Sequence, residues 1–110
     1  MILVLDKDIK VQEINNKGCE ILGYDENEII NKDWCSMFVP QKFRQRAIDV
    51  LTGIIEGKIE INEYIENPIL TKAGESRLIA WHNVALYDEA RHIIKIVSIG
   101  EDITDRKKVE

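Results

Sequence analysis

The sequence predicts an α+β fold, a five-stranded antiparallel sheet with short helices and one longer helix packed on one face. The first observation is the order of the elements, two strands, a run of helices and then three strands. Strands and helices that segregate in this way are typical of an antiparallel sheet covered by helices on one side. The second observation is size and composition. A chain of 110 residues, 45% of them hydrophobic and 32% charged, suits one globular domain with a single core.

The N-terminal segment predicts a β-hairpin and then a short helix. Residues 1–5 form an apolar run, residues 6–8 resemble a turn, and residues 9–14 mix apolar and polar side chains as a second strand would. The Asn15-Asn16 pair offers N-cap side chains to the helix that follows. Gly23 supplies the left-handed residue at which helices commonly end.

The middle of the chain predicts a cluster of short helices followed by one long helix. Asp25, with Glu28 three residues later, has the spacing of a capping box, and Asp33 is placed to cap another short turn. Pro40 suits the first turn of a longer helix that reaches Gly57. The apolar residues that recur along this helix at spacings of three and four are Phe43, Ala47, Val50, Leu51, Ile54 and Ile55.

The C-terminal half predicts three strands, over residues 58–71, 76–87 and 92–102, with turns between them. The faces of the middle strand carry Leu78, Ala80, Val84 and Leu86 on one side, and Ile79, Trp81, Ala85 and Tyr87 on the other. An antiparallel sheet with one face in water should alternate cleanly between apolar and polar residues. Since neither face is plainly polar, we expect the second face to be covered, either by a flanking helix or by a second copy of the domain.

The overall charge argues against nucleic acid and membrane partners. The net charge is −5 and the isoelectric point is near 5.1, whereas nucleic-acid affinity comes mainly from clustered lysine and arginine. The apolar runs are a few residues long, far below the roughly 20 residues that a membrane-spanning helix needs. We therefore expect a cytoplasmic domain that makes no membrane contact.

The residues with reactive side chains form no recognisable catalytic or metal-binding motif. Cys19 and Cys35 are too few for a disulfide framework and have no histidines at metal-ligand spacing, so we expect buried thiols in a reducing compartment. His82 and His92 fall in a strand and at a hairpin end, with no nucleophile motif beside either. The sequence therefore predicts that this chain is not an enzyme.

Two motifs occur in the first half of the chain. Asn15 is followed eight and nine residues later by Gly23-Tyr24. The segment at residues 28–32, Glu-Ile-Ile-Asn-Lys, leads to Trp34 and then to the Phe-Val-Pro at residues 38–40.

Two further motifs occur in the second half. Residues 71–75 read Thr-Lys-Ala-Gly-Glu, and residues 100–110 contain Asp102-Ile103-Thr104 followed by a basic segment. Taken in this order and spacing, the four motifs resemble the PAS family of sensory domains. Asn31 stands where the family usually has glycine, and asparagine tolerates a positive φ well. The last hairpin, at residues 89–92, lacks the usual glycine, so its turn is expected to differ.

The resemblance implies a PAS domain over residues 1–104 and the start of a C-terminal output or linker helix over residues 105–110. In the family, such domains serve multidomain signalling proteins, among them sensor histidine kinases of two-component systems and cyclic-dinucleotide enzymes. Asp102, Ile103 and Thr104 would then relay a signal to a covalently linked effector. The alternative for this ending is a frayed, solvated tail.

The resemblance also bears on cofactors. A haem-binding relative would carry a ligating histidine on the long helix, and residues 40–57 contain none. A flavin photosensor would carry a reactive cysteine in an Asn-Cys-Arg-Phe-Leu-Gln box, which the surroundings of Cys35 do not match. Both cofactors are disfavoured, and a small-molecule ligand or no ligand remains.

By analogy with the family, the sheet face toward the helices should carry Ile65, Asn67, Ile79, Trp81, Asn83, Ile96, Ser98 and Gly100. The candidate ligand-binding residues are Asn67, Trp81, Asn83 and Ser98, whose polar groups could orient a ligand in an apolar pocket. They could equally satisfy one another as buried polar residues of an ordinary core.

Three functions follow for the whole chain. The first is a sensory and relay domain, and the second is a ligand-free module that holds two chains together as a homodimer through the sheet face or flanking helices. The third, a small enzyme, has the least support because no acid–base pair is visible.

Overall fold

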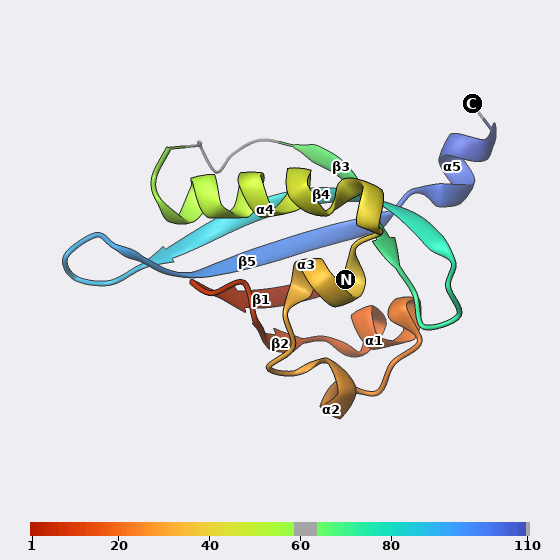
Figure 1. The fold of residues 1–110 in the computed structure, drawn as a ribbon, viewed down its shortest axis with the longest axis horizontal. Coiled ribbons are helices and arrows are strands. Elements are labelled where there is room, and N and C mark those ends of the chain that lie inside the picture. Colours follow the sequence, from red (N-terminus) through yellow and green to blue (C-terminus); the bar gives the residue numbers. More distant parts are fainter. Residues whose placement is uncertain (59–63, 110) are drawn as a thin grey trace.

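The structure is a computed structural model that describes residues 1–58 and 64–109. In chain order the elements are β1 (Ile2–Asp6), β2 (Val11–Ile14), α1 (Asn16–Leu22), α2 (Glu26–Ile29), α3 (Trp34–Phe38), α4 (Gln41–Ile55), β3 (Ile65–Leu70), β4 (Ser76–Tyr87), β5 (Ile93–Asp102) and α5 (Thr104–Val109). Two strands, four helices and three strands therefore precede the terminal helix, which confirms the predicted order (Figure 1).

The five strands form one antiparallel sheet in the order β2-β1-β5-β4-β3. The last strand lies at the centre, so the N-terminal hairpin pairs with the end of the chain rather than with β3. The backbone of Met1 exchanges two 2.8 Å hydrogen bonds with Gly100. In Figure 1, α1 to α4 lie on one side of this sheet, and α5 projects from the end of β5.

The short helices begin at the residues that the sequence indicates. The side chain of Asn15 accepts a 3.0 Å hydrogen bond from Gly18 N, and Gly23 ends α1 with φ of 79°. Asp25 and Glu28 form the predicted capping box, and Asp33 accepts from the backbone of α3. These interactions join residues three apart or fewer, which is why local sequence rules found them.

The two positions at which the sequence departs from the family pattern both lie in turns and contain a residue with positive φ. Asn31 has φ of 66°, the left-handed conformation that its place in the motif predicts. Arg91 has φ of 67° at the tip of the β4–β5 hairpin, where glycine would adopt that conformation without strain.

Several element boundaries differ from the predicted ones. In the first half, β2 begins at Val11 instead of residue 9, and α4 ends at Ile55 instead of reaching Gly57. Strand β3 begins at Ile65, whereas the prediction began at residue 58. Lys58 and Tyr64 are not in a strand, and residues 59–63 of the predicted strand lie outside the described residues. Strand β5 begins at Ile93, one residue later than predicted. Helix α5 begins at Thr104, one residue earlier, and Glu110 lies outside the described residues.

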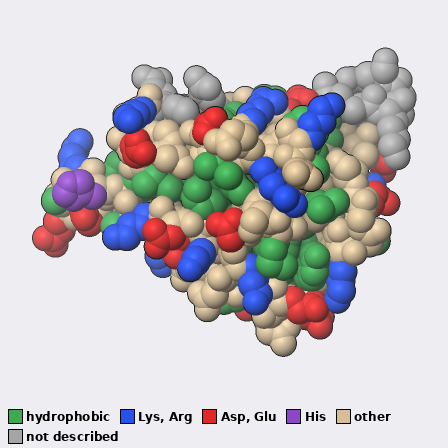
Figure 2. All heavy atoms as spheres, viewed as in Figure 1, with side chains coloured by type: hydrophobic (Ala, Val, Ile, Leu, Met, Phe, Trp, Pro, Cys, Tyr) green, Lys and Arg blue, Asp and Glu red, His purple; other side chains and the backbone are tan. Residues whose placement is uncertain are grey.

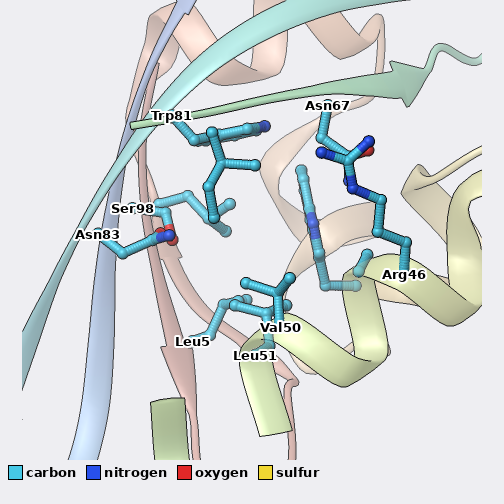
Figure 3. Close-up of a pocket in the computed structure, with 12 residues that line it drawn as sticks. Leu5, Arg46, Val50, Leu51, Asn67, Trp81, Asn83 and Ser98 are labelled. Carbon is cyan, nitrogen blue, oxygen red and sulfur yellow. The ribbon is translucent and has the colours of Figure 1, made fainter. Parts of the chain in front are cut away.

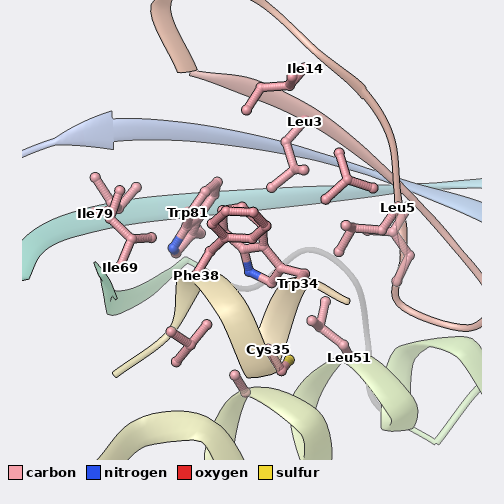
Figure 4. Packing of buried hydrophobic residues seen from close by; sticks show 14 of the residues in the cluster. Leu3, Leu5, Ile14, Trp34, Cys35, Phe38, Leu51, Ile69, Ile79 and Trp81 are labelled. Carbon is pink, nitrogen blue, oxygen red and sulfur yellow. The ribbon is translucent and has the colours of Figure 1, made fainter. Parts of the chain in front are cut away.

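The core fills the space between the helices and the inner face of the sheet (Figure 4). Trp34 lies at its centre, with ring centroids 5.2 Å from Phe38 and 6.0 Å from Trp81. The two indole planes meet at 90°, an edge-to-face arrangement that suits the charge distribution of aromatic rings. Cys35 is buried in this core, whereas Cys19 is only half-buried, so the expectation of two buried thiols holds for Cys35 alone.

The outer face of the sheet is apolar at its centre. Strand register places four exposed side chains on this face: Ile2, Val84, Leu86 and Ile99, each 44–47% exposed. Val4 and Val97 pair directly between them. The sequence predicts this absence of a polar face, and the described residues leave these four side chains open to solvent.

Candidate functional site

The candidate site is a cavity between α4 and the inner face of the sheet, with a volume of about 40 Å³ (Figure 3). The four residues proposed from the sequence, Asn67, Trp81, Asn83 and Ser98, all line it. They come from three adjacent strands, and their shared face follows from strand pairing, which sets Asn67 beside Ile79 and Asn83 beside Ser98. The remaining lining residues are Leu3, Leu5, Trp34, Arg46, Ala47, Val50, Leu51 and Ile65.

The polar residues of the cavity differ in how they are satisfied. The Ser98 hydroxyl donates a 2.6 Å hydrogen bond to Asn83 Oδ1, and both side chains are buried. Asn67 is also buried, but its Oδ1 has no hydrogen-bond partner among the described residues. A buried acceptor without a donor is unfavourable, so Asn67 carries a cost that the paired Asn83 does not.

Arg46 is a lining residue that inspection of the sequence for apolar spacing missed. It extends from α4 toward the Asn67 amide in Figure 3 and is exposed, so it stands where the cavity meets solvent. A signal for it was present, since Arg46 lies three residues after Phe43 and four before Val50, on the apolar side of the helix. A helix face defined by its hydrophobic residues alone does not include Arg46.

Trp81 connects the cavity to β5. Its ring packs on Gly100, where an added Cβ would lie 2.7 Å from Trp81 Cζ3 and 2.6 Å from Ile79 Cγ2. Trp81 pairs with Gly100, and Ile79 pairs with Asp102. The cavity wall and the end of β5 are therefore two residues apart on the same pair of strands.

The residues proposed for signal relay form one bonded cluster at the start of α5. Asp102 Oδ1 accepts from the Thr104 backbone N–H at 3.0 Å and from its hydroxyl at 2.6 Å. Thr104 Oγ1 in turn accepts from Leu78 N at 2.8 Å. Ile103 is 2% exposed, and its N–H donates to the Leu78 carbonyl. The start of α5 is thus bonded to both the carbonyl and the N–H of Leu78 on β4, through Ile103 and Thr104.

Arg77 completes this cluster and was also missed by the sequence reasoning. Its Nε donates to Asp102 Oδ2 at 2.8 Å. Burial disfavours the charged Asp102 carboxylate, but hydrogen bonds from Arg77 and Thr104 favour it more, so the pKa of Asp102 lies below its usual value. These partners stand 25 residues apart, and only the register of β4 against β5 brings them together.

Other reactive groups do not gather into a second site in the described part of the chain. Burial raises the pKa of the Cys35 thiol to about 12, which keeps it in the unreactive protonated form. Both histidines are exposed. Within residues 1–58 and 64–109, no group of three histidine, cysteine or acidic side chains is arranged to hold a metal ion.

Two further features of the structure are its surface charge and the character of its helices. Basic and acidic side chains are interspersed over the face seen in Figure 2, with no continuous basic patch on it. None of the described helices combines the length and apolar character that crossing a membrane requires.

The fold is shared with known sensory domains. The structure resembles the PAS domain of the Cronobacter turicensis RpfR quorum-sensing receptor in complex with C12:0, with a TM-score of 0.79, 24% identity and coverage of 94% of this chain and 92% of that one. The same domain in complex with BDSF gives a TM-score of 0.76 and 25% identity, with the same coverage.

A sensory box histidine kinase/response regulator from Burkholderia thailandensis gives a TM-score of 0.71 at 21% identity, covering 98% of this chain and 79% of that one. No curated protein matches the chain. A family model described as the PAS fold matches residues 1–108. With nearly the whole chain matched in sequence and the sheet, helices and cavity in place, this protein belongs to the PAS family.

Proposed function

We propose that this domain is the sensory and relay unit of a larger signalling protein, and that it binds a small organic molecule in the cavity between α4 and the sheet. The observation that carries the proposal is Asn67, a buried residue of the cavity lining whose Oδ1 has no hydrogen-bond partner among the described residues. An ordinary core residue at that position would be apolar or paired. The RpfR PAS domain with C12:0 or BDSF bound supports ligand binding as a property of this fold.

The relay follows from the contact between the cavity wall and β5. A ligand that pushes the Trp81 ring toward β5 would also push the backbone of Gly100, because the ring occupies the space where a Gly100 Cβ would lie. Asp102 lies two residues further along β5 and holds the first turn of α5 through Thr104. A shift of a few tenths of an ångström at Gly100 would therefore reach α5 without passing through solvent. A coupling free energy of about 1–3 kcal/mol is sufficient for such a switch.

The effector that we propose is a sensor histidine kinase joined after α5, because the ending at residues 100–110 resembles the endings of PAS domains in such kinases. Native mass spectrometry of the purified 110-residue chain tests the first step, since a bound molecule adds its mass to the protein. Hydrogen exchange tests the second step. Ligand should change the exchange rates of the amides at residues 104–109, and Arg77→Met should reduce that change while ligand still binds.

Two results would contradict this proposal. The first is a chain that carries no bound molecule and whose melting temperature no metabolite of a broad panel raises. The second is a ligand that binds in the cavity while the exchange rates of α5 stay the same. The first result would remove the sensory function, and the second would remove the relay through Asp102.

The outer face of the sheet favours a second function, a homodimerisation module. Four exposed apolar side chains lie together on it, and contiguous apolar surface of this kind commonly marks an interface. Sedimentation of the Ile99→Lys variant tests this, with Ile48→Lys on α4 as the control, because both isoleucines are exposed, by 46% and 37%. A dimer lost in the first variant alone supports the module, and a monomeric unmodified chain at high concentration rejects it.

A further inference from the structure

The outer face of the sheet carries opposite charges at the two ends of its central strand. Strand pairing places Lys95 beside Asp6 and Leu86, near the β4–β5 hairpin. At the other end of β5, where α5 leaves the sheet, it places Glu101 beside Ala80 (Figure 1). Because side chains alternate between the two faces of a strand, Lys95 and Glu101 share the outer face with the apolar residues between them.

Both charged groups are available to a partner. Lys95 has no ion pair with another residue in the described part of the chain. Glu101 accepts one 2.6 Å hydrogen bond from Arg106, and its side chain is still 72% exposed. The face therefore consists of a cation at one end, apolar residues in the middle and a carboxylate at the other end. Such a pattern is complementary to a second copy of itself that is turned end for end.

Two symmetric arrangements could bring two outer faces together. Packed sheets keep their strand directions within about 30° of each other, so β5 can lie over β5 with the strands running either the same way or opposite ways. In the parallel arrangement, Lys95 would lie over Lys95 and Glu101 over Glu101. In the antiparallel arrangement, with the two-fold axis at the level of Ser98, Lys95 lies over Glu101 of the partner subunit. Like charges repel across an interface, which favours the antiparallel arrangement.

The apolar residues fit the antiparallel arrangement equally well. Ser98 is midway between Lys95 and Glu101, so an axis at its level places Val97 over Ile99 of the partner subunit. On β1, Ile2 is paired with Ile99, and Val4 with Val97. The same axis therefore places Ile2 over Val4 of the partner subunit, and the centre of the interface is apolar on both copies.

The parallel arrangement would also bury a charge against an apolar residue. In it, β1 of one copy would lie over β4 of the other. Asp6 and Leu86 both pair with Lys95, one on each side of β5, so the Asp6 carboxylate would face the leucine of the second copy. A carboxylate that loses its hydration without gaining a partner is unfavourable.

We propose that the outer face binds a second copy of this chain in the antiparallel orientation, with Lys95 of each copy paired with Glu101 of the partner subunit. This inference rests on the dimerisation module proposed above, and it adds the orientation and the ion pair. It also has a consequence for α5, which projects from the end of β5 (Figure 1). The two α5 helices leave opposite ends of the pair, so effectors joined after α5 are held apart. The pair is then a resting arrangement for an effector that acts as a dimer.

Analytical ultracentrifugation of charge-reversal variants of the 110-residue chain tests the orientation. Lys95→Glu should raise the dimer Kd about tenfold, because two symmetric contacts change from attraction to repulsion. Glu101→Lys should do the same. The double variant exchanges the two charges, so its Kd should return to within about threefold of the original value. In the parallel orientation every variant would still oppose like charges, so the single changes would have little effect.

Two control variants separate the ion pair from other effects of the changes. Lys42→Glu makes the same charge reversal on α4, on the other side of the sheet, and should leave the Kd within about twofold. Arg106→Gln removes the contact that Glu101 makes within its own chain and should not raise the Kd. Circular dichroism during heating shows whether each variant remains folded.

Each outcome bears on either the orientation or the dimer itself. If Lys95→Glu and Lys42→Glu raise the Kd equally, the effect is one of net charge and the ion pair is refuted. A double variant as weak as the single variants rejects the antiparallel orientation.

The failure of the orientation and the failure of the dimerisation module are distinguishable. If Ile99→Lys abolishes the dimer and Lys95→Glu leaves the Kd unchanged, the outer face is the interface and the orientation is wrong. If the unmodified chain is a monomer at high concentration, both are wrong. The sensory function stands in either case, because it depends on the cavity on the inner face.

Discussion

Replacement of Asn67 by leucine should stabilise the ligand-free domain. Asn67 Oδ1 is buried without a hydrogen-bond partner among the described residues, and such an acceptor costs about 1–3 kcal/mol. Leucine removes that cost and places apolar atoms against a cavity of about 40 Å³. If only the first effect counts, at about 4 °C per kcal/mol for a domain of this size, the melting temperature should rise by about 4–12 °C.

Asn83→Leu is the matched control, because it makes the same change on the neighbouring strand of the same cavity. Asn83 Oδ1 already accepts a 2.6 Å hydrogen bond from Ser98. Its removal leaves the buried Ser98 hydroxyl without its partner, so the melting temperature should fall by a similar amount. Both variants are measured without ligand, by circular dichroism during heating.

The reasoning is refuted if Asn67→Leu lowers the melting temperature. That result would mean that Asn67 Oδ1 is satisfied in solution, and the main support for a ligand in the cavity would be lost. A rise of the same size in both variants would also refute it, since the Asn83 hydrogen bond would then contribute nothing.

Three further predictions concern β5 and its hairpin. Gly100→Ala should lower the melting temperature by the equivalent of about 1–3 kcal/mol, because the new methyl group would meet Trp81 Cζ3 at 2.7 Å; an unchanged melting temperature would show that the indole moves freely. The lowered pKa of Asp102 means that its stabilising effect is complete above the unfolded pKa of about 3.9 and is lost as pH falls through the lower folded pKa. The stability difference from Asp102→Asn should therefore shrink in acid, and a constant difference in denaturant titrations down to pH 2 would contradict the contact with Arg77. Arg91→Gly should stabilise the domain by up to about 1 kcal/mol, since φ of 67° is strained for arginine; a lower melting temperature would show that the Arg91 side chain contributes more than its backbone strain costs.

The sequence was most informative where structure depends on neighbours in the chain. The caps at Asn15, Asp25 and Asp33 bond groups at most three residues away, and all three are present. The left-handed conformation of Asn31 followed from a motif position and the tolerance of asparagine for positive φ. The order of strands and helices followed from hydrophobic spacing, which directly reflects which side of each element faces the core.

The sequence was less informative about contacts between distant elements. The pairing of Arg77 with Asp102 requires the register of β4 against β5, which hydrophobic alternation fixes only to within two residues. The cation at the cavity mouth was missed for a related reason. Arg46 reaches the cavity because α4 crosses the sheet there, and the helical pattern alone does not say where the helix crosses.

By itself, the sequence determined the fold, the family motifs and the inner face that gathers Asn67, Trp81, Asn83 and Ser98. Nothing in the sequence distinguishes the Asn67 amide from the Asn83 amide. Only the tertiary structure decided that the Asn83 amide is paired and the Asn67 amide is not. The physical reason is that a hydrogen bond needs donor and acceptor within a few tenths of an ångström of their ideal separation. That separation is set by how strands and helices pack together, and no spacing along the chain encodes it.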